Sequence, residues 1–554
     1  MKYIIIGAVA GGASTAARLR RMDESAEIIM FEKGDYVSYA NCGLPYYIGN
    51  VITEEQKLFV QTAVGFKDRF NIDVRLKQEV IAIDRGQKTV SVRNLLTHQE
   101  YQESYDKLVL SPGAEPIRPP LPGIDLSGIF TLRNVPDMHS IKNLAQQKKS
   151  AVVVGAGFIG LEMAENLKHL GLDVTIVEMA DQILAPVDFP IAAIAQQHLR
   201  AQGVTLLLNT AVSSFEKTVD GLKVNLTQGT PLQTDMVILS IGVRPDTKLA
   251  VAAGLELGKA KGIWVNEHLQ TSDPDIYAVG DAIEFENPIT GVSVNTYLAG
   301  PANKQGRICA DNIVLGNKRS CKGAINTAIV KLFDLTVGAT GMAAKHLKRL
   351  NIPHIVSTTR SASHATYYPG ASQMVIQIVF SPDDGTLLGA QVAGGEGVDK
   401  RLDVFATFIQ QKKTIYDLTE FEHAYAPPYS SAKDPVNMAG FVAENLLHGL
   451  FKVIYWEDFE TLCRENNALC LDVRTPKEHA VKTIPGAINI PLDELRQRMG
   501  ELPKDKPVYL FCEIGLRGYL AQRILRQKGY SEVYNLSGGF SLWNVVTAEK
   551  SLMN

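Results

Sequence analysis

The chain contains 554 residues, of which 45% are hydrophobic and 21% are charged, and its formal net charge is -3 at pH 7. At about 100–200 residues per domain, this length predicts several domains, and the lack of a basic surplus argues against nucleic acid as a partner. The apolar start has no basic segment before it and is too short to span a membrane, so we expect a buried strand there and a cytoplasmic protein without a membrane span.

A dinucleotide-binding pattern opens the chain. Residues 2–21 read as a strand, a glycine-rich turn and a helix that begins at residue 13, and a second strand at 27–31 ends next to an acidic residue. Glycines in such a turn let backbone amides approach a pyrophosphate at a helix N-terminus, while the acid accepts hydrogen bonds from a ribose. Val9 replaces the middle glycine, so this motif alone could be an ordinary glycine-rich turn. The residues assigned to the dinucleotide are Gly7, Gly11, Gly12 and Glu32.

A single cysteine follows in the segment SYANCGLPY at residues 38–46. No second cysteine lies nearby, so Cys42 cannot form an internal disulfide within this motif. A redox thiol here must bond to a small-molecule thiol, a persulfide sulfur or an oxygen. Its reactivity requires a lowered pKa, supplied by nearby cations or a helix N-terminus. The alternative is a small buried core thiol.

A second dinucleotide pattern begins with a strand at 151–154, followed by GAGFIG at 155–160, a helix at 161–170 and a strand at 174–177. The turn matches GxGxxG fully, and the order strand, turn, helix, strand and acid supports the motif. A carboxylate after the second strand can hold the 2′-hydroxyl of NADH and would repel the 2′-phosphate of NADPH, so NADH is favoured over NADPH. The residues assigned to the nicotinamide nucleotide are Gly155, Gly157, Gly160 and Glu178.

Two further turns, SPGA at 111–114 and SIGVRP at 240–245, each follow an apolar strand and read as crossovers between two domains. The segment TSDPDIYAVGD at 271–281 ends in an aspartate. By itself, an aspartate after a glycine is usually a helix cap.

Over roughly residues 1–445 these motifs resemble the pyridine nucleotide–disulfide oxidoreductases. The closest resemblance is to the single-cysteine branch, which contains coenzyme A disulfide reductases, coenzyme A persulfide reductases and NADH oxidases or peroxidases. The resemblance implies an α/β fold with two Rossmann-like FAD- and NAD(P)-binding domains and an α+β dimerisation domain. The implied bounds are 1–113 with 249–322 for FAD, 114–248 for NAD(P)H and 323–446 for dimerisation. It also assigns Gly113, Gly280 and Asp281 to FAD.

The same resemblance places Cys42 over the flavin and brings two tyrosines of the partner subunit, Tyr367 and Tyr425, to the reactive sulfur. Phenols can hydrogen-bond a thiolate or protonate a leaving one. An active homodimer is therefore implied. Alternatively, both tyrosines only pack at the interface, and the neighbouring Tyr368 and Tyr429 leave the register open.

Coenzyme A carries phosphates, so basic residues are expected along its path. Arg18 and Arg21 are three positions apart on the first helix and share a face. The resemblance assigns this pair to the nucleotide end of coenzyme A and places Ser38 and Asn41 by the pantetheine. A basic pair on a surface helix is otherwise only solvated charge.

Residues 453–548 resemble a rhodanese domain, with the motifs LCLDVR, GAINIP, CEIGLR and SGGF. Four residues separate Cys512 from Arg517, which gives the six-residue loop of sulfurtransferases, whereas related phosphatases use one residue more. Backbone amides ahead of a helix form an anion-binding nest that stabilises a persulfide, so Cys512 is the predicted sulfur carrier and Arg517 orders the loop. Asp472 and Arg474 are expected to pair nearby. An inert regulatory rhodanese is the alternative.

Together these patterns predict FAD-dependent, NAD(P)H-driven reduction of coenzyme A persulfides or polysulfides, and of coenzyme A disulfide, through Cys42. Sulfide and coenzyme A thiol are released, and Cys512 carries sulfane sulfur. The alternatives are a mainly coenzyme A disulfide reductase, an NADH oxidase or peroxidase that cycles Cys42 through a sulfenic acid, and a sulfurtransferase with a sensor or docking flavoprotein half. No metal site or structural disulfide is expected, and four cysteines should pack in or near the core without a partner: Cys309, Cys321, Cys463 and Cys470.

Overall fold

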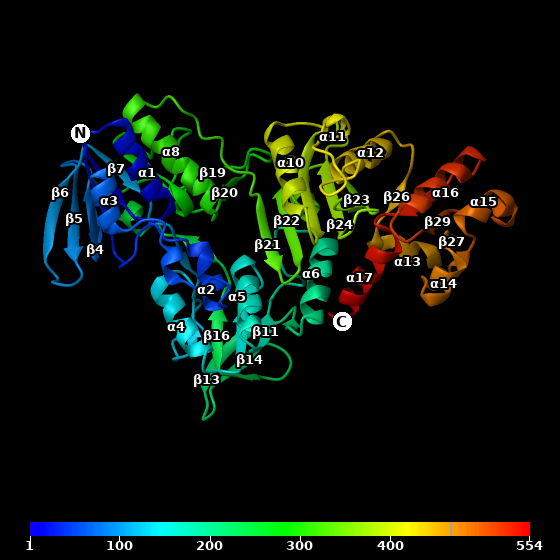
Figure 1. Ribbon diagram of the computed structural model, residues 1–554, viewed down its shortest axis with the longest axis horizontal. Helices are drawn as coiled ribbons and strands as arrows, with labels where there is room; N and C mark the ends of the chain where they lie inside the picture. The colour runs from blue at the N-terminus through cyan, green and yellow to red at the C-terminus, as the bar shows by residue number, and fades with distance from the viewer. Residues whose placement is uncertain (466–467, 554) are drawn as a thin grey trace. The chain divides into compact units, whose positions relative to one another are not determined.

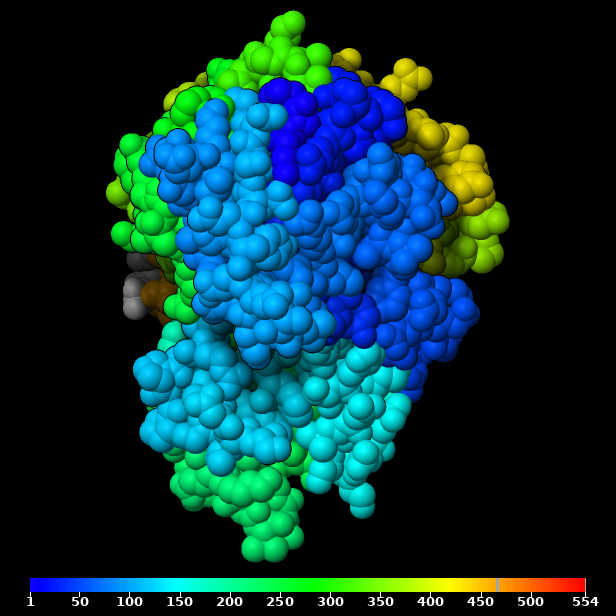
Figure 2. Space-filling model, turned by 90° about the vertical axis from the view of Figure 1, so that its left-hand side faces the viewer, coloured from blue at the N-terminus to red at the C-terminus, as the bar shows by residue number. Residues whose placement is uncertain are grey.

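The computed structural model describes residues 1–465 and 468–553 (Figure 1). The chain divides into two compact units, one formed by Met1–Met179 with Thr210–Asn326 and the other by Ala180–Asn209 with Thr327–Asn554. Both combine helices and strands, so the predicted α/β class is confirmed. No helix among the described residues is long and apolar enough to cross a membrane. Figure 2 shows the first unit from the side on which its amino-terminal elements, in blue, reach the surface.

A parallel sheet of order β18-β7-β1-β2-β3 forms the first part of the first unit. Its strands are β1 (Lys2–Ile6), β2 (Glu27–Glu32), β3 (Asp73–Leu76), β7 (Lys107–Leu110) and β18 (Ile276–Ala278). Two helices, α1 (Ala10–Met22) and α8 (Ala299–Leu315), pack against each other. They approach so closely that a Cβ on Gly306 would lie 2.6 Å from the carbonyl oxygen of Gly11. The helix predicted from residue 13 thus begins three residues earlier, inside the glycine-rich turn.

A second parallel arrangement in this unit runs in the order β11-β10-β16-β9. Its elements are β9 (Ile129–Phe130), α4 (Val135–Ala145), β10 (Ser150–Val154), α5 (Phe158–His169), β11 (Asp173–Val177) and β16 (Met236–Leu239). Helix α2 (Leu44–Ile48) follows Cys42 and packs on α4 and α5. Both predicted crossover turns lead into strands that pair with each other, β8 (Ala114–Pro116) and β17 (Val243–Pro245).

Smaller elements complete the first unit. Two three-stranded antiparallel sheets and one pair of short strands flank the parallel sheets. They comprise β4 (Gln78–Asp84), β5 (Thr89–Asn94), β6 (Glu100–Ser104), β13 (Val212–Lys217), β14 (Leu222–Leu226), β15 (Leu232–Thr234), β19 (Glu284–Glu286) and β20 (Ser293–Asn295), with the helices α3 (Ala63–Phe70) and α7 (Lys248–Ala252).

The second unit begins with an antiparallel sheet of order β21-β22-β25-β24-β23. Its strands are β21 (Ala328–Leu332), β22 (Leu335–Gly341), β23 (Ile355–Ala362), β24 (Gln373–Phe380) and β25 (Leu387–Gly394). The accompanying elements are α6 (Phe189–Ala201), β12 (Thr205–Leu207), α9 (Ala344–Arg349), α10 (Val398–Gln410), α11 (Ile415–Glu420) and α12 (Pro435–Leu447). Asp188, which is buried before α6, accepts hydrogen bonds of 2.6 Å from the side-chain amides of Gln377 and Gln391. This carboxylate therefore fixes the start of α6 to the sheet.

The carboxyl-terminal part of the second unit is a parallel sheet of order β26-β30-β29-β27-β28. Its elements are β26 (Val453–Ile454), α13 (Trp456–Glu465), β27 (Leu469–Asp472), α14 (Pro476–Val481), β28 (Ile488–Asn489), α15 (Leu492–Arg498), β29 (Val508–Phe511), α16 (Leu516–Gln527), β30 (Val533–Leu536) and α17 (Gly539–Ser551). Cys512 follows the central strand β29, at the carboxyl edge where parallel sheets place their ligand sites. Helix α17 packs on α6.

Candidate active site

A cavity of about 740 Å³ in the first unit collects the first dinucleotide motif. A Cβ on Gly7, whose φ is +96°, would lie 2.0 Å from the carbonyl oxygen of Ser111, and a Cβ on Gly12 would lie 1.8 Å from that of Gly7. Only glycine therefore permits this turn. The predicted residues that line the cavity are Gly7, Gly11, Glu32, Asn41, Cys42, Gly113, Gly280 and Asp281.

The two acids at the strand ends occupy equivalent positions in the two motifs. The Glu32 carboxylate accepts a hydrogen bond of 3.1 Å from the amide of Ala8, and Glu178 accepts one of 2.7 Å from the amide of Ala156. In the second turn, a Cβ on Gly157 would meet no atom within 4 Å. Glycine at that position leaves open space for a ligand beside the amides. Both motifs thus have the form that holds a dinucleotide.

Arg133 also lines the large cavity, although no sequence motif indicates it. A Cβ on Gly113 would lie 2.4 Å from its guanidinium, so this glycine makes room for the arginine. Burial raises the pKa of Asp281, and the positive charge of Arg133 acts against that rise. A cation and a carboxylate with a raised pKa therefore share one wall of the cavity.

Cys42 lies in a short helical turn, Asn41–Gly43, and its side chain is exposed. Its amide donates a 3.1 Å hydrogen bond to the Asn41 side chain. Although Cys42 reaches the surface, the protein groups around its thiol partly desolvate it and raise its pKa, and the negative charges of Glu162 and Asp281 raise it further. The expectation of nearby cations that lower this pKa is therefore wrong for the protein's own groups. A backbone hydrogen bond at Cys42 acts in the opposite direction and lowers the pKa.

Glu162, which the sequence analysis missed, lies on α5 beside Tyr46. The Tyr46 hydroxyl donates a 3.4 Å hydrogen bond to the Glu162 carboxylate. Burial raises the pKa of Glu162 to about 7, with a smaller contribution from Glu165. A group that titrates near neutral pH therefore lies within electrostatic reach of Cys42.

The residues predicted to bind coenzyme A lie in different environments. Arg18 donates a 2.6 Å hydrogen bond to the buried Asp311, which also pairs with Arg319, whereas Arg21 is exposed. Ser38 adopts a φ of +46°, a left-handed conformation unusual for serine, and its amide donates to the carbonyl oxygen of Ala8 at 2.8 Å. Backbone strain of this kind is concentrated at functional sites.

In the second unit the structure brings together the two predicted tyrosines, 58 residues apart in sequence. The hydroxyl oxygens of Tyr367 and Tyr425 lie 3.2 Å apart, and the two side chains are 74% and 49% exposed. Tyr368 instead packs edge-on against His364. This pairing favours the predicted register over one that uses Tyr368 or Tyr429.

A buried ion pair holds the two tyrosine-bearing segments side by side. The guanidinium of Arg401 donates to the Asp434 carboxylate at 2.8 Å, and both side chains are 2% exposed. Arg401 also donates to the carbonyl oxygen of Ser363, close to Tyr367, at 2.8 Å. Ser430, close to Tyr425, donates to Asp434 at 2.6 Å. Sequence reasoning missed this pair, although Arg401 occupies a position on the apolar stripe of α10.

The loop that begins at Cys512 has the geometry of an anion-binding nest. The Cys512 side chain is buried, and its sulfur accepts a 3.1 Å hydrogen bond from the amide of Gly515. On the other side of the loop, the amides of Phe540 and Ser541 donate to the carbonyl oxygens of Cys512 and Glu513 at 2.8 and 3.0 Å. The first turn of α17 therefore binds the carbonyl groups of the loop, and the amide of Gly515 donates to the sulfur from within it.

Ion pairs surround this loop. Asp472 and Arg474 form the predicted buried pair at 2.9 Å, and Arg474 also binds Glu513 at 3.1 Å. Arg517 binds Glu478 of α14 through hydrogen bonds of 2.7 and 2.6 Å, which lower the pKa of that carboxyl to about 2. Arg517 thus connects the loop to α14.

The other cysteines follow the prediction only in part. All six cysteines are free, and Cys309 is fully buried. The expectation that Cys463 and Cys470 have no partner is wrong, because a hydrogen bond between their side chains and burial together raise the pKa of Cys470. Both side chains belong to one apolar cluster, so the contact results from packing.

Comparison with known proteins gives three family matches. The family described as pyridine nucleotide-disulphide oxidoreductase matches residues 1–306, its dimerisation domain matches 327–435, and the rhodanese-like domain matches 456–545. A coenzyme A disulfide reductase from Staphylococcus epidermidis is 38% identical over 445 residues, which are 80% of this chain and 100% of the relative.

Two solved structures are similar over nearly the whole chain. Reduced Bacillus anthracis CoADR-RHD is 49% identical with a TM-score of 0.96, over 99% of this chain and 98% of that one. A NAD-dependent persulfide reductase from A. fulgidus is 37% identical with a TM-score of 0.92, over 98% of this chain and 100% of that one.

Proposed function

The chain belongs to the pyridine nucleotide-disulphide oxidoreductase family, and from this premise we propose that it reduces coenzyme A persulfides and coenzyme A disulfide with NADH through Cys42. FAD and a nicotinamide dinucleotide are the cofactors of the family. The observation that carries the proposal is an accessible lone cysteine in the wall of a dinucleotide cavity, in a chain that also contains a rhodanese domain. NADPH is the less favoured donor because of Glu178.

The large cavity fits FAD. Gly7 and Gly12 form a turn that only glycine permits, and the Glu32 carboxylate beside it can accept hydrogen bonds from a ribose. Asp281, at the end of the segment 271–281, also lines the cavity. FAD held there would supply two-electron transfer between NADH and sulfur. The glycine turn of the second motif and Glu178 hold NADH.

Cys42 is the residue that exchanges sulfur bonds. Its thiolate attacks the inner sulfur of a coenzyme A persulfide, so that a Cys42–coenzyme A disulfide forms and hydrosulfide leaves. Two electrons and one proton then return the Cys42 thiolate and release coenzyme A thiol. Attack on the outer sulfur would instead give a Cys42 persulfide and coenzyme A thiol, and reduction of that persulfide releases sulfide. With coenzyme A disulfide, the products are two thiols.

Tyr367 and Tyr425 supply a proton to the leaving thiolate, and their paired hydroxyls support this role. In the proposal they act on Cys42 of the other subunit, so the active form is a homodimer. Arg18 and Arg21 bind the nucleotide end of coenzyme A, while Ser38 and Asn41 contact the pantetheine. The domain bounds predicted from sequence and the cytoplasmic location are part of the same proposal.

Cys512 carries sulfane sulfur in this scheme. It accepts sulfur from a donor as a persulfide stabilised by the amide of Gly515, and a coenzyme A thiolate removes that sulfur for delivery to Cys42. Glu513 gives the rim of the loop a negative charge next to Arg474. We therefore expect modest turnover of thiosulfate relative to neutral or thiol-derived persulfides.

The test is anaerobic NADH oxidation with coenzyme A persulfide and coenzyme A disulfide in parallel, with sulfide measured in each. The proposal expects about one sulfide per NADH with the persulfide and loss of both activities in Cys42→Ser. In Cys512→Ser, persulfide reduction should persist, while sulfide release from a sulfur donor plus coenzyme A should fall. Undiminished activity of Cys512→Ser with every donor would refute the carrier role.

The main rivals give different results in the same assay. A preference for the disulfide with no sulfide would make coenzyme A disulfide reduction the main role. Faster NADH oxidation with oxygen or peroxide than with either coenzyme A substrate would favour the sulfenic acid cycle.

A further inference from the structure

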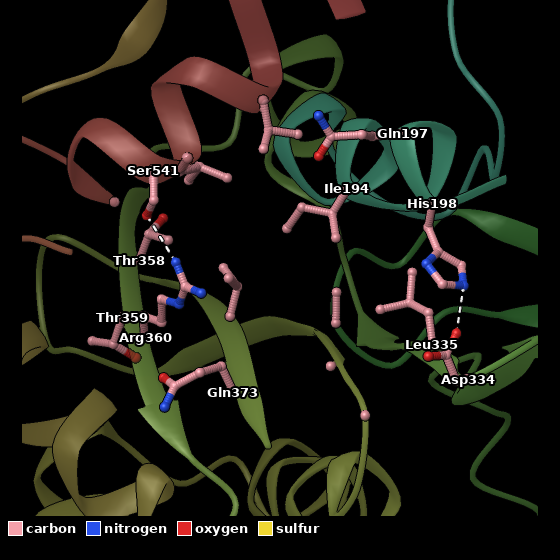
Figure 3. Close-up of a pocket in the computed structure, with 17 residues that line it drawn as sticks. Ile194, Gln197, His198, Asp334, Leu335, Thr358, Thr359, Arg360, Gln373 and Ser541 are labelled. Carbon is pink, nitrogen blue, oxygen red and sulfur yellow. Dashed lines mark hydrogen bonds and ion pairs between the residues drawn. The ribbon is translucent and has the colours of Figure 1, made fainter. Parts of the chain in front are cut away.

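A second cavity, of about 390 Å³, lies within the second unit (Figure 3). It is formed by α6, the strands β22 to β25 and the first turns of α17. In Figure 3, Arg360 and Ser541 lie together on one side, and His198 and Asp334 lie on the other. This volume is within the range of small-molecule sites.

The charge of this cavity is positive on the Arg360 side. The Arg360 guanidinium donates a 3.0 Å hydrogen bond to the Ser541 hydroxyl, and no carboxylate among residues 1–465 and 468–553 forms an ion pair with it. The one acidic residue in the lining, Asp334, lies 2.9 Å from His198. A guanidinium has five donors, so Arg360 keeps donors for an acceptor in the cavity.

The rest of the wall combines an apolar part with the polar side chains of Gln197, Thr358, Thr359 and Gln373. In the apolar part, Ile194 of α6 belongs to one hydrophobic cluster with Leu542 and Val545 of α17, and Leu335 and Val375 come from the sheet. Such a wall suits a hydrocarbon or aromatic body, while the arginine suits a planar or tetrahedral anion.

Helix α17 both lines the cavity and contacts the Cys512 loop. Ser541, which binds Arg360 with its hydroxyl, donates its amide to the carbonyl oxygen of Glu513 at 3.0 Å. The amide of the neighbouring Phe540 donates a hydrogen bond to the carbonyl oxygen of Cys512. Ser541 therefore links the wall of this cavity to the Cys512 loop.

We propose that this cavity binds a small organic anion with an apolar body, whose carboxylate, sulfonate or phosphate group lies against Arg360 and Ser541. Occupation of the site slows opening of the Cys512 loop. The site is separate from the dinucleotide cavity and does not require the coenzyme A chemistry proposed for Cys42.

The binding test uses anilinonaphthalene sulfonate, an anion with an aromatic body, titrated calorimetrically into the full-length enzyme as isolated. Loss of a charged hydrogen bond corresponds to about 10- to 100-fold weaker binding, so we expect that change in Arg360→Gln. The matched control is Arg349→Gln on α9, an exposed arginine outside the cavity, which should bind as the unmodified enzyme does. Val545→Phe fills the apolar part and should also abolish this binding event.

A second measurement follows the alkylation of Cys512 in a Cys42→Ser background with and without the probe. Protection that disappears in Arg360→Gln supports the proposal, because direct occupation of the Cys512 loop would protect both proteins equally. Equal binding by Arg360→Gln and the unmodified enzyme, or no binding at all, overturns the site. Binding without protection overturns its effect on the loop. None of these outcomes depends on NADH oxidation, so they are distinct from a failure of the proposed function.

Discussion

The charge state of Cys42 depends on the carboxylates around it. Glu162 has a pKa of about 7, so above that pH its negative charge opposes ionisation of the thiol. We predict that Glu162→Gln moves the pH profile of Cys42 alkylation by iodoacetamide to lower pH, because a like charge is removed. The control is Glu24→Gln, an exposed acid on the same unit. Superimposable profiles for Glu162→Gln and the unmodified enzyme would show that Glu162 has no influence on the thiol.

At the scale of elements, the buried pair of Arg401 and Asp434 determines how the two tyrosine segments meet. Removal of one partner of a buried ion pair costs about 3–5 kcal/mol, so Asp434→Asn should lower the free energy of unfolding by roughly that amount. Because Ser363 and Ser430 then lose their common anchor, we also expect kcat for coenzyme A persulfide to fall while alkylation of Cys42 stays unchanged. Urea unfolding and steady-state kinetics test the two effects.

Glu494→Gln is the matched control for that variant. It removes an exposed i,i+4 pair with Arg498, which is worth about 0.3–0.5 kcal/mol. If Asp434→Asn unfolds at the same urea concentration as Glu494→Gln, the buried pair does not organise these segments.

Local patterns account for what the sequence predicted and for what it missed. The two glycine turns depend on residues within one short stretch, so their strands, helices and acids were foreseeable. The Tyr367–Tyr425 contact joins distant segments, and only family resemblance indicated it. Glu162 and Arg133 carry no motif, and their environment depends on the packing of several elements. Arg401 offered one signal, since a charged residue on the apolar stripe of an amphipathic helix must find a buried partner.

At the scale of the whole molecule, α17 ties the rhodanese domain to α6. Leu542 and Val546 pack with Ala193, and the side chain of Gln196 donates to Glu549 at 3.1 Å. Removal of residues 453–554 exposes this face, so we predict an apparent Tm lower by at least ~5 °C. Reduction of coenzyme A disulfide should persist at low temperature. Differential scanning calorimetry checks the shift, and an unchanged Tm for the remaining transitions would contradict it.

The second unit takes α6 from an early part of the chain and its sheet from a later one. During synthesis, about 190 residues separate the end of α6 from the end of β25, which corresponds to roughly 10–40 s at 5–20 residues per second. Until β25 is made, α6 lacks part of the sheet that it packs on in the folded protein, and the carboxylate of Asp188 lacks the amide of Gln391. The nascent chain therefore exposes apolar surface of α6 on the ribosome. Synthesis is the stage at which we expect the chain to aggregate or to bind chaperones most readily.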